Sequence, residues 1–159
     1  MNIKKTKGFT IIEVVLVLAI AGLIFLMVFI ALPALQRNQR DSARKQEVST
    51  VLAQVTSYQS NNRGTSPAIS IATKTAFAKY LEGTVDATGV ITLNSGTIVT
   101  FGATPTVSVS SAATNDNMYV YIGAKCDTAV PGNVIKGTAR QAAAVMTLEN
   151  SGSNYCQTN

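Results

Sequence analysis

The chain has 159 residues, of which only 13% are charged and 6% aromatic, and it contains no histidine. This length allows one small domain plus an anchor. The formal net charge of +5 arises near the N-terminus, because residues 46–159 hold six basic and six acidic side chains. A near-neutral C-terminal part lacks the basic footprint of nucleic-acid binding. Without histidine, the usual catalytic triads and the commonest metal ligand are excluded. We therefore expect no catalytic residues, no metal site and no cofactor.

The N-terminus begins with a basic leader, Met1–Lys7, followed by Gly8, Phe9 and the lone carboxylate of Glu13. The next nineteen residues, 14–32, include no charged or hydrogen-bonding side chain. As a helix they would extend about 28 Å, which is enough to cross the hydrocarbon core of a membrane. The pattern predicts a membrane-spanning helix with a carboxylate near its start.

Two other interpretations of the apolar run are open, a cleavable secretory signal peptide and an uncleaved signal anchor. The run is longer than a usual signal-peptide core, and Ala31–Ala34 is a poor cleavage site. Basic residues flank both ends in similar numbers, so the positive-inside rule does not fix the orientation. The two cysteines favour an exported C-terminal part.

An amphipathic helix is predicted after the apolar run. Its apolar positions recur at helical spacing and are Val48, Val51, Leu52, Val55 and Tyr58. The sequence Asn61–Gly64 followed by Pro67 supplies a stop. We therefore expect one helix from the membrane to about Asn62, with a possible break at Pro33.

The remaining residues predict a small β-rich head. A short helix is expected at residues 73–83, with Thr73 as its N-cap and Gly83 as its end. A hairpin is expected from residues 90–93 and 97–101, and a strand of alternating character at residues 118–122. Residues 142–148 are expected to form a strand, although a helix also fits their pattern. A weaker strand is expected at residues 106–110. The predicted fold class is α+β, with a long N-terminal helix packed against a small antiparallel sheet.

Cys126 and Cys156 are separated by twenty-nine residues. An even pair of cysteines in an exported domain predicts a disulfide. Closing a loop of this size would stabilise the head by about 3–4 kcal/mol in the chain-entropy model.

The order of basic leader, Gly8-Phe9-Thr10-Ile11-Ile12-Glu13 and apolar run resembles the N-terminal signature of type IV pilins. The resemblance implies that a prepilin peptidase in the membrane cuts after Gly8 and N-methylates Phe9. It divides the chain into a leader (1–8), a transmembrane and filament-core half-helix (9–35), an amphipathic half-helix (36–62) and a head (63–159). Independently, Gly8 has no side chain and can lie extended in a protease cleft. The cysteine pair is similar to the disulfide-closed C-terminal loop of pilins.

Glu13 is the fifth residue counted from Phe9, where pilins carry a glutamate. A charge in the membrane costs about 2.5–3.5 kcal/mol, so such a residue usually has a partner. Cleavage after Gly8 would create an amine on Phe9 that is largely charged at neutral pH. Glu13 is therefore expected to neutralise the Phe9 amine of a neighbouring subunit, with snorkelling to the headgroups as the alternative.

Gly22 and Pro33 are the two helix-weakening residues of the anchor. Pilins often carry a glycine at the position of Gly22 and a proline eight residues later, but Ile30 occupies that place here. A local melting of the helix and a tolerated kink both remain open.

Arg37, Arg40 and Arg44 share one helix face. Three roles are open for them: contact with lipid headgroups, pairing with a neighbouring subunit's Asp41 or Glu47, and exposure to solvent. DNA capture occurs in pili, but the sequence does not support nucleic acid as a partner here.

The resemblance predicts a pilus subunit made as a single-pass membrane precursor and then polymerised into an extracellular filament for adhesion or twitching motility. The expected partners are other pilin subunits, the prepilin peptidase and the inner-membrane pilus assembly machinery. A pseudopilin of a type II secretion or DNA-uptake machine is the alternative, followed by an extracellular binding module on a signal anchor.

Overall fold

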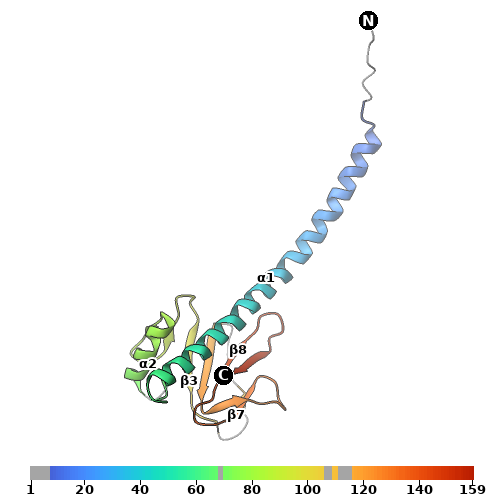
Figure 1. Ribbon diagram of the computed structural model, residues 1–159. Helices are drawn as coiled ribbons and strands as arrows, with labels where there is room; N and C mark the ends of the chain where they lie inside the picture. The colour runs from blue at the N-terminus through green and yellow to red at the C-terminus, as the bar shows by residue number, and fades with distance from the viewer. Residues whose placement is uncertain (1–7, 68–69, 106–108, 111–115) are drawn as a thin grey trace. The chain divides into compact units, whose positions relative to one another are not determined.

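A computed structural model describes residues 8–67, 70–105, 109–110 and 116–159 of the chain (Figure 1). The predicted leader, apart from Gly8, lies outside the described residues. The chain divides into two compact units, with the boundary between Arg37 and Asn38. The first unit is the apolar half of the long helix. The second unit, residues 38–159, includes the other half of that helix, and we call this whole unit the head.

The long helix α1 extends from Ile11 to Asn61 without interruption. It includes Pro33, so the possible break at that residue does not occur. Its end agrees with the expected stop. Arg63 takes a left-handed conformation (φ 55°), and the backbone N–H of Gly64 donates to the carbonyl of Gln59 at 2.6 Å. This six-to-one hydrogen bond closes the last turn in the manner of a Schellman motif.

The short helix of the head differs from the prediction at both ends. Helix α2 spans Ile71–Ala78, and the 3₁₀ turn η1 spans Lys79–Leu81. The N-cap is Ser70, whose hydroxyl accepts the N–H of Thr73, while the Thr73 hydroxyl accepts the N–H of Ser70. Thr73 is therefore the third residue of a capping box and not the cap itself.

Gly83 does not end the helix through its conformation, because Glu82 takes the left-handed position (φ 52°). Gly83 is required for another reason. A Cβ atom at this residue would lie 2.9 Å from the carbonyl oxygen of Thr92, so the absent side chain permits close packing of two backbone segments.

Nine strands form two sheets within the described residues. Their bounds are β1 Thr84–Val85, β2 Ile91–Thr92, β3 Ile98–Gly102, β4 Val109–Ser110, β5 Asn117–Ile122, β6 Ala124–Cys126, β7 Asn133–Lys136, β8 Ala142–Thr147 and β9 Asn154–Thr158. The larger sheet has the order β1-β2-β3-β5-β8-β9, and the smaller has β4-β7-β6.

The predicted α+β fold and the predicted hairpin β2–β3 are confirmed. The sheet is not wholly antiparallel, because β3 and β5 pair in parallel. Parallel neighbours need a long crossover, and the segment between β3 and β5 supplies β4 to the smaller sheet. Of the weak strand expected at 106–110, Val109–Ser110 forms β4 and residues 106–108 lie outside the described part.

The head has two apolar clusters, one on each face of the larger sheet. On one face the predicted stripe of α1 is buried against the sheet, together with Phe77, whose ring meets those of Tyr58 and Phe101 edge to face. On the other face Ala143 and Val145 of β8 contact the smaller sheet. In Figure 1 the half of α1 that belongs to the head runs beside β3 and β8.

Burial on both faces explains the ambiguous sequence of β8. Ala142, Ala144 and Met146 face the first cluster, whereas Ala143 and Val145 face the second. A strand covered on both sides is an unbroken apolar run and does not alternate. The strand interpretation of residues 142–148 is confirmed, with Thr147 as the last residue.

Candidate processing and assembly site

Gly8 and Phe9 precede the first helical residue and are exposed. The Phe9 side chain is 87% exposed, and no heavy atom lies within 4 Å of where a Cβ on Gly8 would be. This non-helical, unhindered backbone is the form in which a peptide enters a protease cleft. The geometry is compatible with cleavage between these residues.

Glu13 closes the first turn of α1. Its Oε2 accepts the backbone N–H of Thr10 at 3.3 Å and the Thr10 hydroxyl at 3.1 Å. A carboxylate in the first turn also interacts favourably with the helix dipole. This local capping role was missed from the sequence, although the spacing of threonine and glutamate in Thr10-Ile11-Ile12-Glu13 is that of a capping box.

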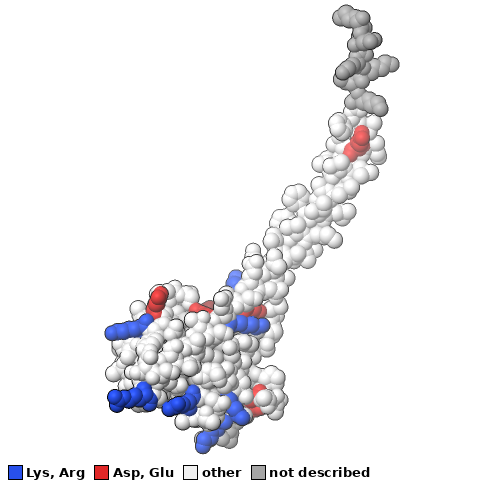
Figure 2. Space-filling view, in the orientation of Figure 1, with Lys and Arg blue, Asp and Glu red and all other residues white. Residues whose placement is uncertain are grey.

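The apolar run is exposed on every side within its own unit. An 18-residue window of α1 has a mean hydropathy of 3.2, and none of it is buried. The exposed side chains include Phe25, Phe29 and Ile30. Residues 14–36 contain no Lys, Arg, Asp or Glu, and Figure 2 accordingly shows a long white segment. Helix α1 is long and apolar enough to cross a membrane.

The basic face of α1 binds the turn that joins β8 and β9. Arg44 Nη2 lies 2.6 Å from Glu149 Oε1, and Arg40 Nε lies 3.0 Å from Glu149 Oε2. Asp41 accepts the backbone N–H groups of Glu149 at 2.7 Å and Asn150 at 3.0 Å. We call Arg40, Asp41, Arg44 and Glu149 the polar clamp.

The polar clamp shows a role for Arg40 and Arg44 within their own subunit. Asp41 and Glu47, the residues expected to pair with a neighbouring subunit's arginines, also have hydrogen-bond partners within their own subunit. Asp41 is only 6% exposed. Glu47 accepts the hydroxyl groups of Ser95 and Thr97.

The burial of Asp41 could have been predicted from the sequence. Asp41 and Arg44 lie seven residues before Val48 and Val51, so the buried stripe of α1 continues through them by one further heptad. The stripe had been traced only through apolar residues, which is why these two polar members were missed.

The pKa of the Asp41 carboxyl lies below its ordinary value. Burial raises it, but the N–H donors of Glu149 and Asn150 and the charges of Arg44 and Lys45 together lower it by more. Asp41 is therefore held as a carboxylate in the folded head. Arg44 Nη1 faces it at 3.5 Å, as an ion pair without a hydrogen bond.

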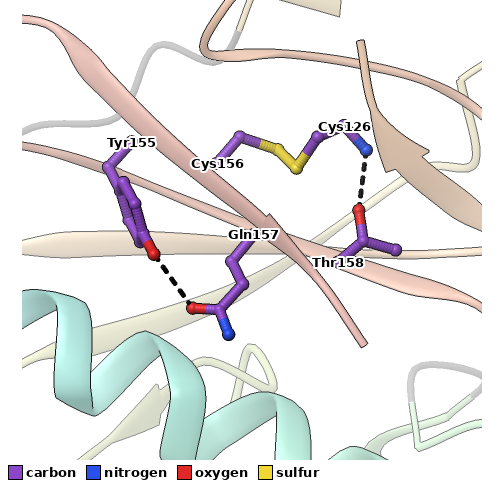
Figure 3. The surroundings of a disulfide bond; sticks show 5 residues. All are labelled: Cys126, Tyr155, Cys156, Gln157 and Thr158. Carbon is purple, nitrogen blue, oxygen red and sulfur yellow. Dashed lines mark hydrogen bonds between the residues drawn. A yellow bond between two sulfur atoms is a disulfide. The ribbon is translucent and has the colours of Figure 1, made fainter. Parts of the chain in front are cut away.

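Cys126 and Cys156 form the expected disulfide (Figure 3). It connects β6 of the smaller sheet to β9 at the edge of the larger one. The backbone N–H of Cys126 also donates to the Thr158 hydroxyl at 2.9 Å. Nearby, the hydroxyls of Tyr155 and Ser49 both donate to the side chain of Gln157, so α1 and the C-terminal strand are connected here.

Replacing both cysteines with serine is expected to lower the free energy of unfolding of the head by about 3–4 kcal/mol, because the unfolded chain regains the entropy of a closed loop. Urea unfolding can be followed by near-ultraviolet circular dichroism, since all five tyrosines lie in the head. Reducing agent should lower the stability of the wild type by a similar amount and leave the double variant unchanged. A stability difference below about 1 kcal/mol would contradict the entropic argument.

Comparison with known proteins agrees with the N-terminal geometry. Residues 3–29, about a sixth of the chain, match the prokaryotic N-terminal methylation motif. This motif is the class III signal peptide of type IV pilins, and it implies processing by a prepilin peptidase and assembly with other pilin-type subunits. No curated protein and no solved structure is significantly similar to the chain.

The motif belongs to a structural class of protein and not to an enzyme class. In the part of the chain that the structure describes, no group of three or more cysteine, aspartate or glutamate side chains is arranged to hold a metal ion.

Proposed function

We propose that this chain is a structural subunit of a type IV pilus. The observation that carries this proposal is a methylation motif that extends into an exposed helical segment whose residues 14–32 are entirely apolar. Processing after Gly8 and N-methylation of Phe9 precede polymerisation through α1. The resulting surface filament serves adhesion, twitching motility or both.

The same apolar helix acts in two environments. Before assembly it holds the precursor in the membrane as a single span. In the filament, the anchors of many subunits pack together and cover one another's apolar surface, with Glu13 of one subunit near the Phe9 amine of the next. The disulfide-closed head, which is polar on its outside, faces the medium.

Electron microscopy of sheared surface material, combined with mass spectrometry of its subunits, tests the proposal. Long filaments that contain this chain with an N-methylated Phe9 would support it. A processed chain that stays with the cell envelope in short assemblies would instead indicate a pseudopilin. A chain with an intact Met1 would indicate a signal-anchored module and would contradict both.

The variant Gly8→Val is expected to remain largely unprocessed. A β-branched side chain hinders the extended backbone in the protease cleft, and a misplacement of this kind can slow a reaction about 10²-fold. Intact-mass measurement of the membrane fraction distinguishes a precursor that begins at Met1 from a chain that begins at Phe9. Gly22→Val is the matched control, because Gly22 also has no neighbour within 4 Å but lies far from the cleavage point. Normal processing of Gly8→Val would show that cleavage at this bond does not depend on the absent side chain of Gly8.

A further inference from the structure

The loop between β6 and β7 presents apolar side chains to solvent. Outside the anchor, the described residues with a large, strongly exposed apolar side chain are Ile71 and Val130. Val130 lies in this loop, between the exposed residues Ala129 and Pro131. We call Ala129, Val130 and Pro131 the loop tip. Single exposed apolar side chains are common, but three in succession on a fixed loop form a surface that another protein can cover.

Hydrogen bonds within the loop fix its conformation. The backbone N–H of Asp127 donates to the carbonyl of Asn133 at 2.9 Å, and the N–H of Asn133 donates to the carbonyl of Val130 at 3.1 Å. The N–H of Ala129 donates to Asp127 Oδ1 at 2.8 Å. The disulfide of Cys126 holds the base of the loop. A loop that is already ordered loses little entropy when it binds a partner.

The loop tip and an open depression of the head lie at opposite ends of β9. A Cβ on Gly132 would be 2.8 Å from the Cβ and the carbonyl oxygen of Asn154, so the loop packs against the first residue of this strand. Asn159, which follows the last residue of β9, lines the depression of about 680 Å³. Five residues of strand extend about 17 Å, so the loop tip and the depression are separate surfaces.

The depression suits an apolar group that is accompanied by negative charge. Ser60 of α1, Arg63 just after α1 and Arg140 of the loop before β8 line it together with Asn159. More of its lining is apolar than polar, because the aliphatic stems of long polar side chains form part of such a surface. Two of the lining residues are arginines, and none is an aspartate or a glutamate.

The β6–β7 loop of the same chain has the matching properties. Residues 127–133 include one acidic side chain, Asp127, and no basic one. Surfaces of opposite charge favour association, and like charges oppose it. A second, smaller depression along α1 is lined by Glu47 and Glu82, so it has the same sign of charge as the loop and does not match it.

We propose that the loop tip of one subunit docks into the depression at the end of α1 in a second copy of this chain. Val130 and Pro131 cover the apolar lining, and Asp127 approaches Arg63 and Arg140. The two surfaces differ and lie at opposite ends of β9, so the contact is heterologous and repeats from head to head, as an open helical assembly requires. The inference rests on the proposed polymerisation and names the surfaces of the head that take part in it.

A photo-cross-linker tests the contact in assembled material. p-Benzoylphenylalanine replaces Val130 in the full-length chain, and the same residue at Ile71 is the matched control. Irradiation should give a covalent dimer from the first variant, with the cross-link mapped by mass spectrometry to residues 56–64 or 140–141 of the second subunit. A cross-link elsewhere, or no more dimer than the control gives, would overturn the proposal.

The same experiment separates this contact from the proposed pilus. Long filaments without the expected cross-link would contradict the contact alone. The expected cross-link in short assemblies of the cell envelope would support the contact while contradicting the pilus.

Charge reversal tests the contact a second time. Val130→Lys places a positive charge against two arginines and should lower the filament yield at least about tenfold. Arg140→Glu should also lower the yield, whereas the double variant should restore most of it, because the new charges attract each other. Ile71→Lys should leave the yield unchanged.

The melting temperature of each variant in detergent verifies that the head is folded. Normal yield from a folded Val130→Lys variant, or a double variant no better than either single one, would overturn the proposal.

Discussion

The variant Glu13→Val is expected to be inserted into the membrane and processed after Gly8 but to yield at least about tenfold less filament. The reason is that the charged Phe9 amine then lies unpaired in hydrocarbon, which costs about 2.5–3.5 kcal/mol. Without Glu13, the Phe9 amine of each neighbouring subunit has no counter-charge when the anchors pack together. A penalty of this size per subunit corresponds to roughly two orders of magnitude in the association constant. Sheared filament mass relative to total subunit gives the yield, and mass spectrometry of the membrane fraction verifies cleavage.

Glu13→Gln separates the two roles of this side chain. Glutamine retains a carbonyl oxygen that can accept the Thr10 donors which cap α1, but it carries no charge. If the charge is what assembly requires, Glu13→Gln should lose filament as Glu13→Val does. Near-normal yield from Glu13→Gln would assign Glu13 to helix capping alone. Normal yield from Glu13→Val would contradict any role of this residue in assembly.

Replacing Asp41 with alanine is expected to lower the free energy of unfolding of the head by about 3–5 kcal/mol, the usual effect of removing one partner of a buried ion pair. Two backbone N–H groups of the β8–β9 turn lose their acceptor, and Arg44 loses one of its two carboxylate partners. Urea unfolding followed by tyrosine circular dichroism measures the effect in the head alone.

Asp86→Ala is the matched control for Asp41→Ala. The Asp86 carboxyl also has a pKa below its usual value, through the Thr88 hydroxyl and nearby backbone N–H groups. It is exposed, however, and its hydrogen bonds stay within one turn. Its loss should therefore cost much less. Equal destabilisation by the two variants would show that the polar clamp does not hold the β8–β9 turn.

The stability contributed by Asp41 should depend on pH in a defined direction. Its folded pKa is below the ordinary value of 3.8, so the unfolded chain binds the proton more readily. The contribution is complete above the unfolded pKa and is lost as the pH falls through the folded pKa. The stability difference between wild type and Asp41→Asn should therefore be largest at neutral pH and shrink below about pH 4. A difference that is constant from pH 7 to pH 3 would contradict this assignment.

Much of the fold could be predicted because its signals are periodic. The stripe from Val48 to Tyr58 repeats at helical spacing, and each of its apolar members is buried. The hairpin β2–β3 has its turn glycine, Gly96, in a left-handed conformation (φ 90°), as a short turn requires. Strands β1, β6, β7 and β9 were not predicted, since short strands of two to five residues contain too few apolar positions to establish a period.

The candidate site was predicted unevenly. Gly8, Phe9 and Glu13 carry a contiguous motif, and the methylation-motif match covers the same residues. The polar clamp was missed because Glu149 lies 105 residues after Arg44, and still further from the other two clamp residues of α1. Spacing within one helix predicts which side chains share a face, but it does not predict which distant loop meets that face.

The sequence by itself determined the N-terminal methylation motif, the length and apolar character of the anchor, the buried stripe of α1 and the presence of a cysteine pair. The cysteine pair is a matter of composition, and each of the other features depends on residues that are adjacent or repeat at a local period. Only the tertiary structure decided the parallel pairing of β3 with β5, the internal use of Asp41 and the convergence of Arg63, Arg140 and Asn159 on one depression. The physical reason is that these contacts join segments whose approach is selected by packing of the whole head, which no local pattern encodes.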